Sequence, residues 1–248
     1  MDIRGRWALV TGGSRGIGAA TVRELAGRGA RVVFTWRTGE REAAELCRSL
    51  PAGAEPLALP CNVCEPSDIE RVAGEIRSRG IEIEVLVNNA GTPIAGSFVD
   101  ATTDQWDHAY ALHVRAPALF AKAVAPGMKA RGRGVIVNIG SVAGLRGVLG
   151  ATLYCTVKGA VIQMTRAMAR DLADSGVRAV CVSPGIIRTD FHRNMTAAQK
   201  KLNEEQRVPL HREGRPEEVA RVIAALVEAD YVTGENVVVD GGLTMRIA

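Results

Sequence analysis

The stretch WALVTGGSRGIG (residues 7–18) decides the fold, because a short apolar run passes through a glycine-rich turn into a helical pattern. The turn reads Thr-Gly-x-x-x-Gly-x-Gly, with Gly12, Gly16 and Gly18, and departs from the more common G-x-G-x-x-G spacing. Glycines allow a tight turn and a close backbone approach, while the start of the helix presents free N–H donors and a positive dipole. The turn favours a site for the pyrophosphate of a dinucleotide; a purely structural turn is the alternative.

Apolar runs like the first one recur along the chain. The expected strands are 7–11, 31–36, 54–59, 84–89, 134–140, 177–183 and 236–240. They are almost uniformly apolar rather than alternating, which is typical of strands buried on both faces of a parallel sheet. Amphipathic helical patterns lie between them. The order predicts an α/β protein: a single domain over residues 1–248 with a Rossmann-type doubly wound fold, its seven-stranded parallel sheet flanked by helices on both faces.

Three sequence motifs predict where helices start. SDIE (67–70) and TTDQ (102–105) read as capping boxes, in which a hydroxyl and an acid or amide satisfy early backbone N–H groups. RPEE (215–218) places Pro216 in a first helical turn, where its missing N–H costs nothing. The segment 186–212 is polar and charged and has no expected strand, so it is predicted to be a substrate loop or lid.

The composition indicates a large aliphatic core, since 47% of the residues are hydrophobic but only 4% are aromatic. The net charge of +4 is small and no basic stripe is visible, so nucleic-acid binding is not expected. Five cysteines without a secretory segment or a long apolar run predict free thiols, a cytoplasmic location and no membrane span. CNVC (61–64) has no second Cys or His pair suitably close, so no metal site is expected.

The end of the second expected strand indicates which nicotinamide cofactor the site prefers. Enzymes that use NAD usually carry Asp or Glu there to accept from the adenosine ribose, but this chain has no acid before Glu40. Arg37 and Arg15 could instead hold a 2′-phosphate. The pattern favours NADP(H); a solvated loop around Arg37 is the alternative.

A second stretch, SVAGLRGVLGATLYCTVK (141–158), carries candidate chemistry. Tyr154 and Lys158 lie one helical turn apart on one face, and Ser141 precedes them at the end of an expected strand. With three tyrosines and five lysines in 248 residues, a Tyr-x-x-x-Lys pair arises by chance with a probability of about 6%. The spacing alone does not separate a proton-transfer site from a bystander pair.

Taken together, the motifs resemble those of the short-chain dehydrogenases/reductases. TGGSRGIG (11–18), NNAG (88–91), Ser141, YCTVK (154–158), SPG (183–185) and VDGG (239–242) occur in the family's order and spacing between about residues 5 and 245. The detail is most similar to 3-oxoacyl-acyl-carrier-protein reductases and polyketide-type ketoreductases. The resemblance implies a cofactor-binding set of Gly12, Ser14, Arg15, Gly16, Ile17, Gly18, Arg37, Asn62, Val63, Asn89, Ala90, Gly91, Tyr154, Lys158, Pro184, Gly185, Ile187 and Thr189.

The resemblance also implies catalytic roles. Tyr154 would donate the proton, Ser141 would hydrogen-bond the substrate carbonyl, and Lys158 would bind the nicotinamide ribose. An unperturbed phenol has a pKa near 10, and the Lys158 charge is expected to lower it towards neutrality. The coincidence of several motifs makes a bystander Tyr–Lys pair improbable.

The chain departs from the family at His113, where members usually carry an asparagine whose backbone carbonyl holds a water in the proton relay. Three interpretations are compatible with the sequence: only the backbone carbonyl at residue 113 matters for the relay, the imidazole itself joins the relay, or turnover is impaired. Replacing His113 with Asn is expected to retain or raise reductase activity.

Three functions follow. The first is an NADPH-dependent ketoreductase of a β-ketoacyl thioester or polyketide, with an acyl carrier protein as a partner that docks on KARGR (129–133); Ser175 stands where the family carries a second basic residue. The second is a dehydrogenase/reductase of a free alcohol, sugar, steroid or xenobiotic ketone. The third is a nucleotide-binding regulator without catalysis. The resemblance implies a homotetramer or homodimer, and the terminal GLTMRIA (242–248) offers apolar residues for packing.

Overall fold

A computed structural model describes residues 1–190 and 195–245. Within them, seven strands form one sheet in the order β3-β2-β1-β4-β5-β6-β7, and every neighbouring pair is parallel. The predicted doubly wound fold is therefore confirmed. The strands are β1 (Trp7–Val10), β2 (Arg31–Trp36), β3 (Leu57–Pro60), β4 (Ile83–Asn88), β5 (Gly134–Ile139), β6 (Val177–Pro184) and β7 (Asn236–Val239).

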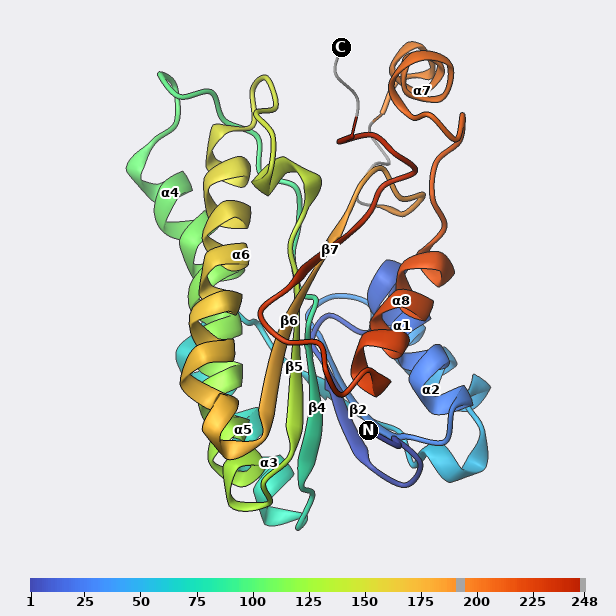
Figure 1. Ribbon diagram of the computed structural model, residues 1–248, viewed down its shortest axis with the longest axis vertical. Coiled ribbons are helices and arrows are strands. Elements are labelled where there is room, and N and C mark those ends of the chain that lie inside the picture. Colours follow the sequence, from blue (N-terminus) through green and yellow to red (C-terminus); the bar gives the residue numbers. More distant parts are fainter. Residues whose placement is uncertain (191–194, 246–248) are drawn as a thin grey trace.

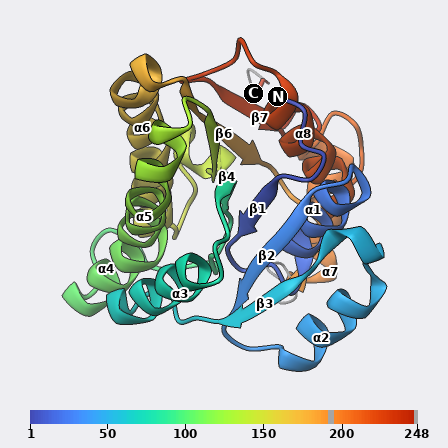
Figure 2. The same ribbon diagram turned by 90° about the horizontal axis from the view of Figure 1, so that it is seen from below.

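Helices cover both faces of the sheet (Figures 1 and 2). One face carries α1 (Gly16–Gly27), α2 (Glu40–Ser49) and α8 (Pro216–Glu228), and the other carries α3 (Pro66–Ser78), α5 (Ala116–Ala130) and α6 (Thr152–Leu172). The helix α4 (Thr103–Tyr110) precedes α5 and packs against α6. Every residue of β4 and β5 is buried, which is why these strands are mostly apolar in sequence rather than alternating.

Two sequence-based boundaries are wrong. The third strand begins at Leu57 rather than residue 54, because Ala52–Ala54 forms a 3-10 turn and Glu55 takes a left-handed conformation with φ of 44°. Ser67 is not a helix cap. Pro66 occupies the first position of α3 with its φ already fixed, so the helix starts earlier, and Glu65 precedes it without a side-chain cap.

The other two starts are confirmed. Thr102 and Gln105 form the reciprocal bonds of a capping box at α4. Pro216 opens α8, and the Glu218 carboxylate in the first turn accepts from the Arg215 N–H at 2.7 Å.

All strands of a parallel sheet end at one edge, and this carboxyl edge is the upper end of the molecule in Figure 1. The chain after β6 forms the short helix α7 (Ala197–Leu202), a π-helical turn (Asn203–Arg207) and a bridge between Ile187 and Gly214 at this end. Parts of the predicted lid (191–194) and of the terminal apolar segment (246–248) lie outside the described residues. No helix in the described ranges is long and apolar enough to cross a membrane.

Candidate active site

The glycine turn between β1 and α1 needs its glycines. Gly12 and Gly16 have φ of 65° and 54°, in the left-handed region that other residues rarely adopt. Gly18 needs the space instead: a Cβ there would lie 2.2 Å from the Gly12 carbonyl oxygen. The result is a tight backbone cradle at the start of α1, which is the geometry that a pyrophosphate requires.

Asn89 holds this cradle in place. Its side-chain Nδ2 donates to the carbonyl oxygens of Thr11 (2.9 Å) and Gly12 (3.0 Å). In return, the Thr11 hydroxyl accepts from the backbone N–H groups of Asn89 (2.9 Å) and Ala90 (3.0 Å). The family resemblance put Asn89 in the cofactor-binding set but did not predict this clamp, because the partners lie 77 and 78 positions apart in the sequence.

Cations lie at the end of β2, as the sequence predicted. Arg15 donates from Nη2 to the Thr38 carbonyl oxygen at 2.7 Å, so its guanidinium is held over the residue that follows Arg37. Both arginines are exposed. At the end of β3, buried Val63 follows Asn62, whose backbone N–H donates to the Asp68 carboxylate. Two exposed guanidiniums beside a glycine cradle fit a nucleotide with a 2′-phosphate.

The segment after β6 closes on the same turn. A Cβ built on Gly16 would lie 3.2 Å from the Thr189 methyl group, and Thr189 in turn donates to the carbonyl of buried Ile187. Gly185, which follows Pro184, is packed so closely on Asp240 that a Cβ would lie 2.6 Å from the aspartate Cβ. Two regions about 170 residues apart in sequence therefore meet at the cradle.

The candidate catalytic residues come together beyond β5. Ser141 follows this strand, and its hydroxyl accepts from the Ala143 N–H at 3.1 Å while hydrogen-bonded to Tyr154. Lys158 lies one turn along α6, with Nζ 5.7 Å from the centroid of the Tyr154 ring. Its buried ammonium donates to the Ile139 carbonyl oxygen at 2.8 Å. A hydroxyl, a phenol and an ammonium thus line one edge of the sheet.

Burial dominates the electrostatics of these groups. Burial raises the pKa of the Tyr154 phenol above its ordinary value, and the hydrogen bond with Ser141 lowers it in part. Burial lowers the pKa of Lys158 to about 8. The sequence predicted that Lys158 would acidify the phenol; in the structure, the loss of solvent dominates, the lowering contribution comes from Ser141, and Tyr154 is held protonated at neutral pH.

His113 is buried, with 1% of its surface exposed, within a π-helical turn (Ala111–Arg115) that connects α4 and α5. Its Nε2 lies 3.0 Å from the Thr92 carbonyl oxygen, a contact that requires the proton on Nε2. The ring meets Tyr154 edge to face, with centroids 5.4 Å apart. Burial, and then the charge of Lys158, hold the pKa of His113 well below its ordinary value. The imidazole is neutral, and Nδ1 has no partner among the described residues.

His113 also explains one glycine. A Cβ on Gly91 would lie 2.8 Å from the imidazole Cε1, so the turn after β4 and the buried ring fit together only without a side chain there. The sequence named both residues but gave no sign that they touch.

Comparisons with known proteins show the family of this chain. A family model described as enoyl-(acyl carrier protein) reductase matches residues 12–244. The chain belongs to the short-chain dehydrogenase/reductase family, and it is an oxidoreductase that acts on CH–OH groups. It is 39% identical to the 3-oxoacyl-acyl-carrier-protein reductase FabG of Vibrio cholerae, over 99% of this chain and 100% of that protein. It is 36% identical to dehydrogenase/reductase SDR family member 4 of Homo sapiens, over 97% of this chain and 88% of that protein.

Two solved structures share the fold of this chain over nearly its whole length. A blue fluorescent protein from a metagenomic library, in complex with NADPH, superposes with a TM-score of 0.91 at 36% identity, covering 98% of this chain and all of that one. The L-sorbose reductase of Gluconobacter frateurii, in complex with NADPH and L-sorbose, gives 0.91 at 28% identity and covers 100% of both chains.

Proposed function

We propose that this protein is an NADPH-dependent ketoreductase that converts a ketone to a secondary alcohol, with Tyr154 as the proton donor. The observation that carries the proposal is the convergence of Ser141, Tyr154 and Lys158 at the carboxyl edge, beside the glycine cradle. NADPH, when bound, supplies a hydride to the carbonyl carbon. The cradle would hold its pyrophosphate, and Arg15 and Arg37 its 2′-phosphate.

The proton step uses Tyr154 as a neutral acid. A phenol whose pKa burial has raised stays protonated at neutral pH, and it is still far more acidic than an alkoxide. Ser141 would donate a hydrogen bond to the carbonyl oxygen as charge develops there. Lys158, an ammonium on the same helix face, stabilises the phenolate that Tyr154 leaves behind.

His113 acts in this proposal through position rather than titration. Its neutral ring supports one edge of Tyr154 and ties the turn at Thr92 to the central helix. This favours the reading in which the backbone and packing at residue 113 matter, and it argues against an imidazole that gains and loses a proton near pH 7.

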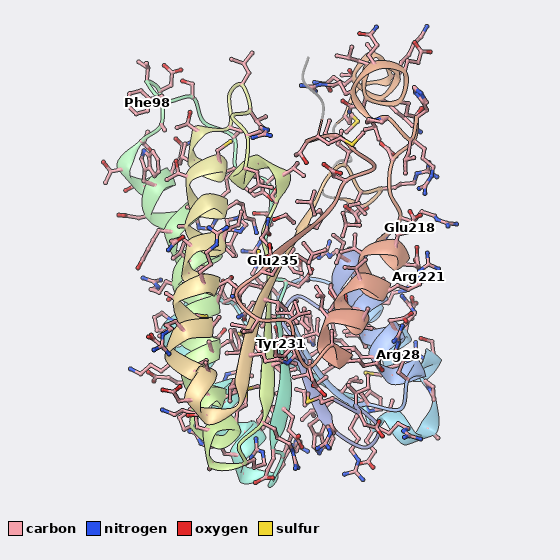
Figure 3. The ribbon with its side chains drawn as sticks, in the orientation of Figure 1. Arg28, Phe98, Glu218, Arg221, Tyr231 and Glu235 are labelled. Carbon is pink, nitrogen blue, oxygen red and sulfur yellow. The ribbon has the colours of Figure 1, made fainter. Side chains whose placement is uncertain are left out.

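The substrate class is inferred from an apolar rim around the carboxyl edge. Most large apolar side chains that are exposed in the described residues follow β4, β5, β6 or β7 there: Phe98, Val99, Val148, Leu149, Leu202, Leu210 and Met245. Figure 3 shows Phe98 at this end of the molecule. Exposed apolar surface beside a reaction site suits a ketone on an apolar chain, the β-ketoacyl thioester class first, and suits a sugar poorly.

A free apolar ketone is the second candidate, because the expected carrier-protein patch is not a set of free cations. In KARGR (129–133), Arg131 pairs with Glu82 at 3.2 Å and Arg133 with Glu84 at 2.6 Å. The patch also precedes β5, at the strand end opposite to Ser141. These two facts argue against an acidic carrier protein docking on this segment, but they do not bear on the proposal of ketone reduction. A cytoplasmic location and a homotetramer or homodimer remain part of the proposal.

The test is an NADPH-oxidation screen of 3-oxoacyl thioesters of increasing chain length, apolar cyclic and aromatic ketones, and L-sorbose. We expect turnover of the thioesters to rise with chain length and L-sorbose to be a poor substrate. Fastest turnover of a polyhydroxy ketone would contradict the substrate class. Tight NADPH binding without oxidation by any ketone would leave only a nucleotide-binding regulator.

A further inference from the structure

The corner between the glycine turn and the start of α2 holds an acid. Gly39 precedes α2 with φ of 105°. A Cβ built on Gly39 would lie 3.2 Å from Glu42 Oε2 and 3.5 Å from Ser14 Oγ. The carboxylate and the hydroxyl therefore both border this point and lie within about 7 Å of each other. Together with Arg15 they line one hollow of about 560 Å³ beside the glycine turn.

The charges in this corner have opposite signs. Arg15 is held over Thr38, directly before Gly39. Glu42 forms no salt bridge within residues 1–190 and 195–245, and its carboxylate is exposed. Glu45, one turn later on α2 and lining the same hollow, is instead paired with Arg41 at 2.8 Å. Of these two acids, Glu42 is the one whose charge is left uncompensated beside Ser14.

We propose that Glu42 is a specificity residue of the nucleotide site, which weakens binding of an adenosine 2′-phosphate and so limits the preference for NADPH over NADH. The inference rests on the proposed use of NADPH. Arg15, Arg37 and Ser14 are donors available to a 2′-phosphate, and the Glu42 carboxylate lies within about 7 Å of the Ser14 hydroxyl. Two anions a few ångströms apart repel, and at an exposed site salt screens the repulsion. The arginines attract the phosphate, and Glu42 opposes them.

The position of Glu42 explains why it could not be predicted from the sequence. The acid that discriminates against NADP normally follows the second strand directly, and here it comes later, within a helix. The left-handed Gly39 turns the chain so that the first turn of α2 faces the glycine turn.

The test is calorimetry with adenosine 2′,5′-bisphosphate and with AMP, which differ only in the 2′-phosphate, on the wild type, Glu42→Gln and Glu45→Gln. We expect Glu42→Gln to bind the bisphosphate about threefold to tenfold more tightly at low salt, with AMP binding unchanged. The gain should shrink at high salt. Glu45→Gln removes the same charge from the same helix and should give less than half of the gain.

Equal affinity of the wild type and Glu42→Gln for the bisphosphate overturns the proposal, as does an equal gain for AMP. A gain in Glu45→Gln as large as in Glu42→Gln also overturns it, because the effect would then be one of general charge. The measurement needs no turnover. If no ketone is reduced, the proposed function fails while the result for Glu42 stands.

Discussion

The two ends of the central strands differ in how their polar groups are satisfied. At the amino end of β4, the Glu84 carboxylate is buried and paired with both Arg6 (2.7 Å) and Arg133 (2.6 Å). At the carboxyl end, the Lys158 ammonium donates to a carbonyl and pairs with no carboxylate in the described residues, where the buried His113 Nδ1 also has no partner. The same strands therefore carry compensated charge at one end and uncompensated groups at the other.

This difference separates stability from chemistry. The Glu84 carboxylate is paired with two guanidiniums, and removing it would leave both without their shared partner. Buried polar groups without partners destabilise the folded protein, and the pKa values of such titratable groups move far from the ordinary ones. Acid–base catalysis makes use of such shifted pKa values. Substitutions at the amino end should change the free energy of unfolding, whereas those at the carboxyl end should change turnover.

The largest expected effect is that of Tyr154→Phe. Removing the hydroxyl that donates the proton should lower kcat by about 10²- to 10⁴-fold for the ketone that the screen identifies as the best substrate, with NADPH affinity nearly unchanged. Steady-state NADPH oxidation and cofactor fluorescence titration measure the two quantities. Tyr110→Phe, which alters an exposed phenol at the end of α4, is the control and should retain full activity. Undiminished velocity in Tyr154→Phe would remove the proposed acid.

Next comes the glycine cradle. Gly18→Ala places a methyl group 2.2 Å from the Gly12 carbonyl oxygen, which is backbone and cannot move aside cheaply. We expect about 2–4 kcal/mol of lost stability and a loss of nucleotide binding. Gly27→Ala, at the other end of α1 with nothing within 4 Å of its Cβ, should be neutral or slightly stabilising. Equal behaviour of the two variants in urea unfolding would contradict the close approach.

Lys158 makes the carboxyl edge sensitive to pH. Its pKa is about 8 in the folded chain, against an ordinary value of 10.5, so the unfolded state binds more protons between these values. Stability contributed by this residue therefore rises as pH increases from about 8 to 10.5. Over that pH range, the unfolding free energy of the wild type should increase by a few kcal/mol relative to that of Lys158→Met.

The buried thiols change stability in the opposite direction there, since burial raises the pKa of Cys61 to about 12. Cys61 is common to the wild type and Lys158→Met and does not sense Lys158, so its contribution cancels in the difference. The pKa of Cys181 is itself lowered by the Lys158 charge, so this thiol offsets a small part of the expected change. A gap that is constant with pH would mean that Lys158 is not desolvated.

The smallest effect is expected at the amino edge. Glu84→Gln leaves Arg6 and Arg133 without their shared carboxylate and should cost about 2 kcal/mol, with kcat/KM unchanged. Glu82→Gln removes a carboxylate that is 67% exposed and should cost less than about 1 kcal/mol. A fall in kcat/KM for Glu84→Gln would show that the two ends are not independent.

The fold could be predicted because its signals are local. Uniformly apolar runs marked the strands, and the glycine turn placed the nucleotide site. Errors occurred where a single residue changes the backbone: Glu55 in a left-handed conformation delays β3, and Pro66 starts α3 early.

The contacts of the site could not be predicted, because they join residues that are distant in the sequence. The bonds from Asn89 to the glycine turn, the fit of Gly91 against His113 and the position of Glu42 beside Ser14 all depend on packing. Residue types could be named from the motifs, but the sign of the Tyr154 pKa change required burial, which a spacing pattern does not contain.

The bridge between Gly96 and Ala151 has a consequence for engineering. The Gly96 N–H donates to the Gly150 carbonyl oxygen, and its own carbonyl accepts from the Thr152 N–H, both at 3.0 Å. The loop that carries Phe98 is thus fastened to the first turn of α6, two residues before Tyr154. Exchanging either loop alone with that of a relative would break this fastening, so grafts that retarget the enzyme should transfer 92–101 and 145–151 as one cassette.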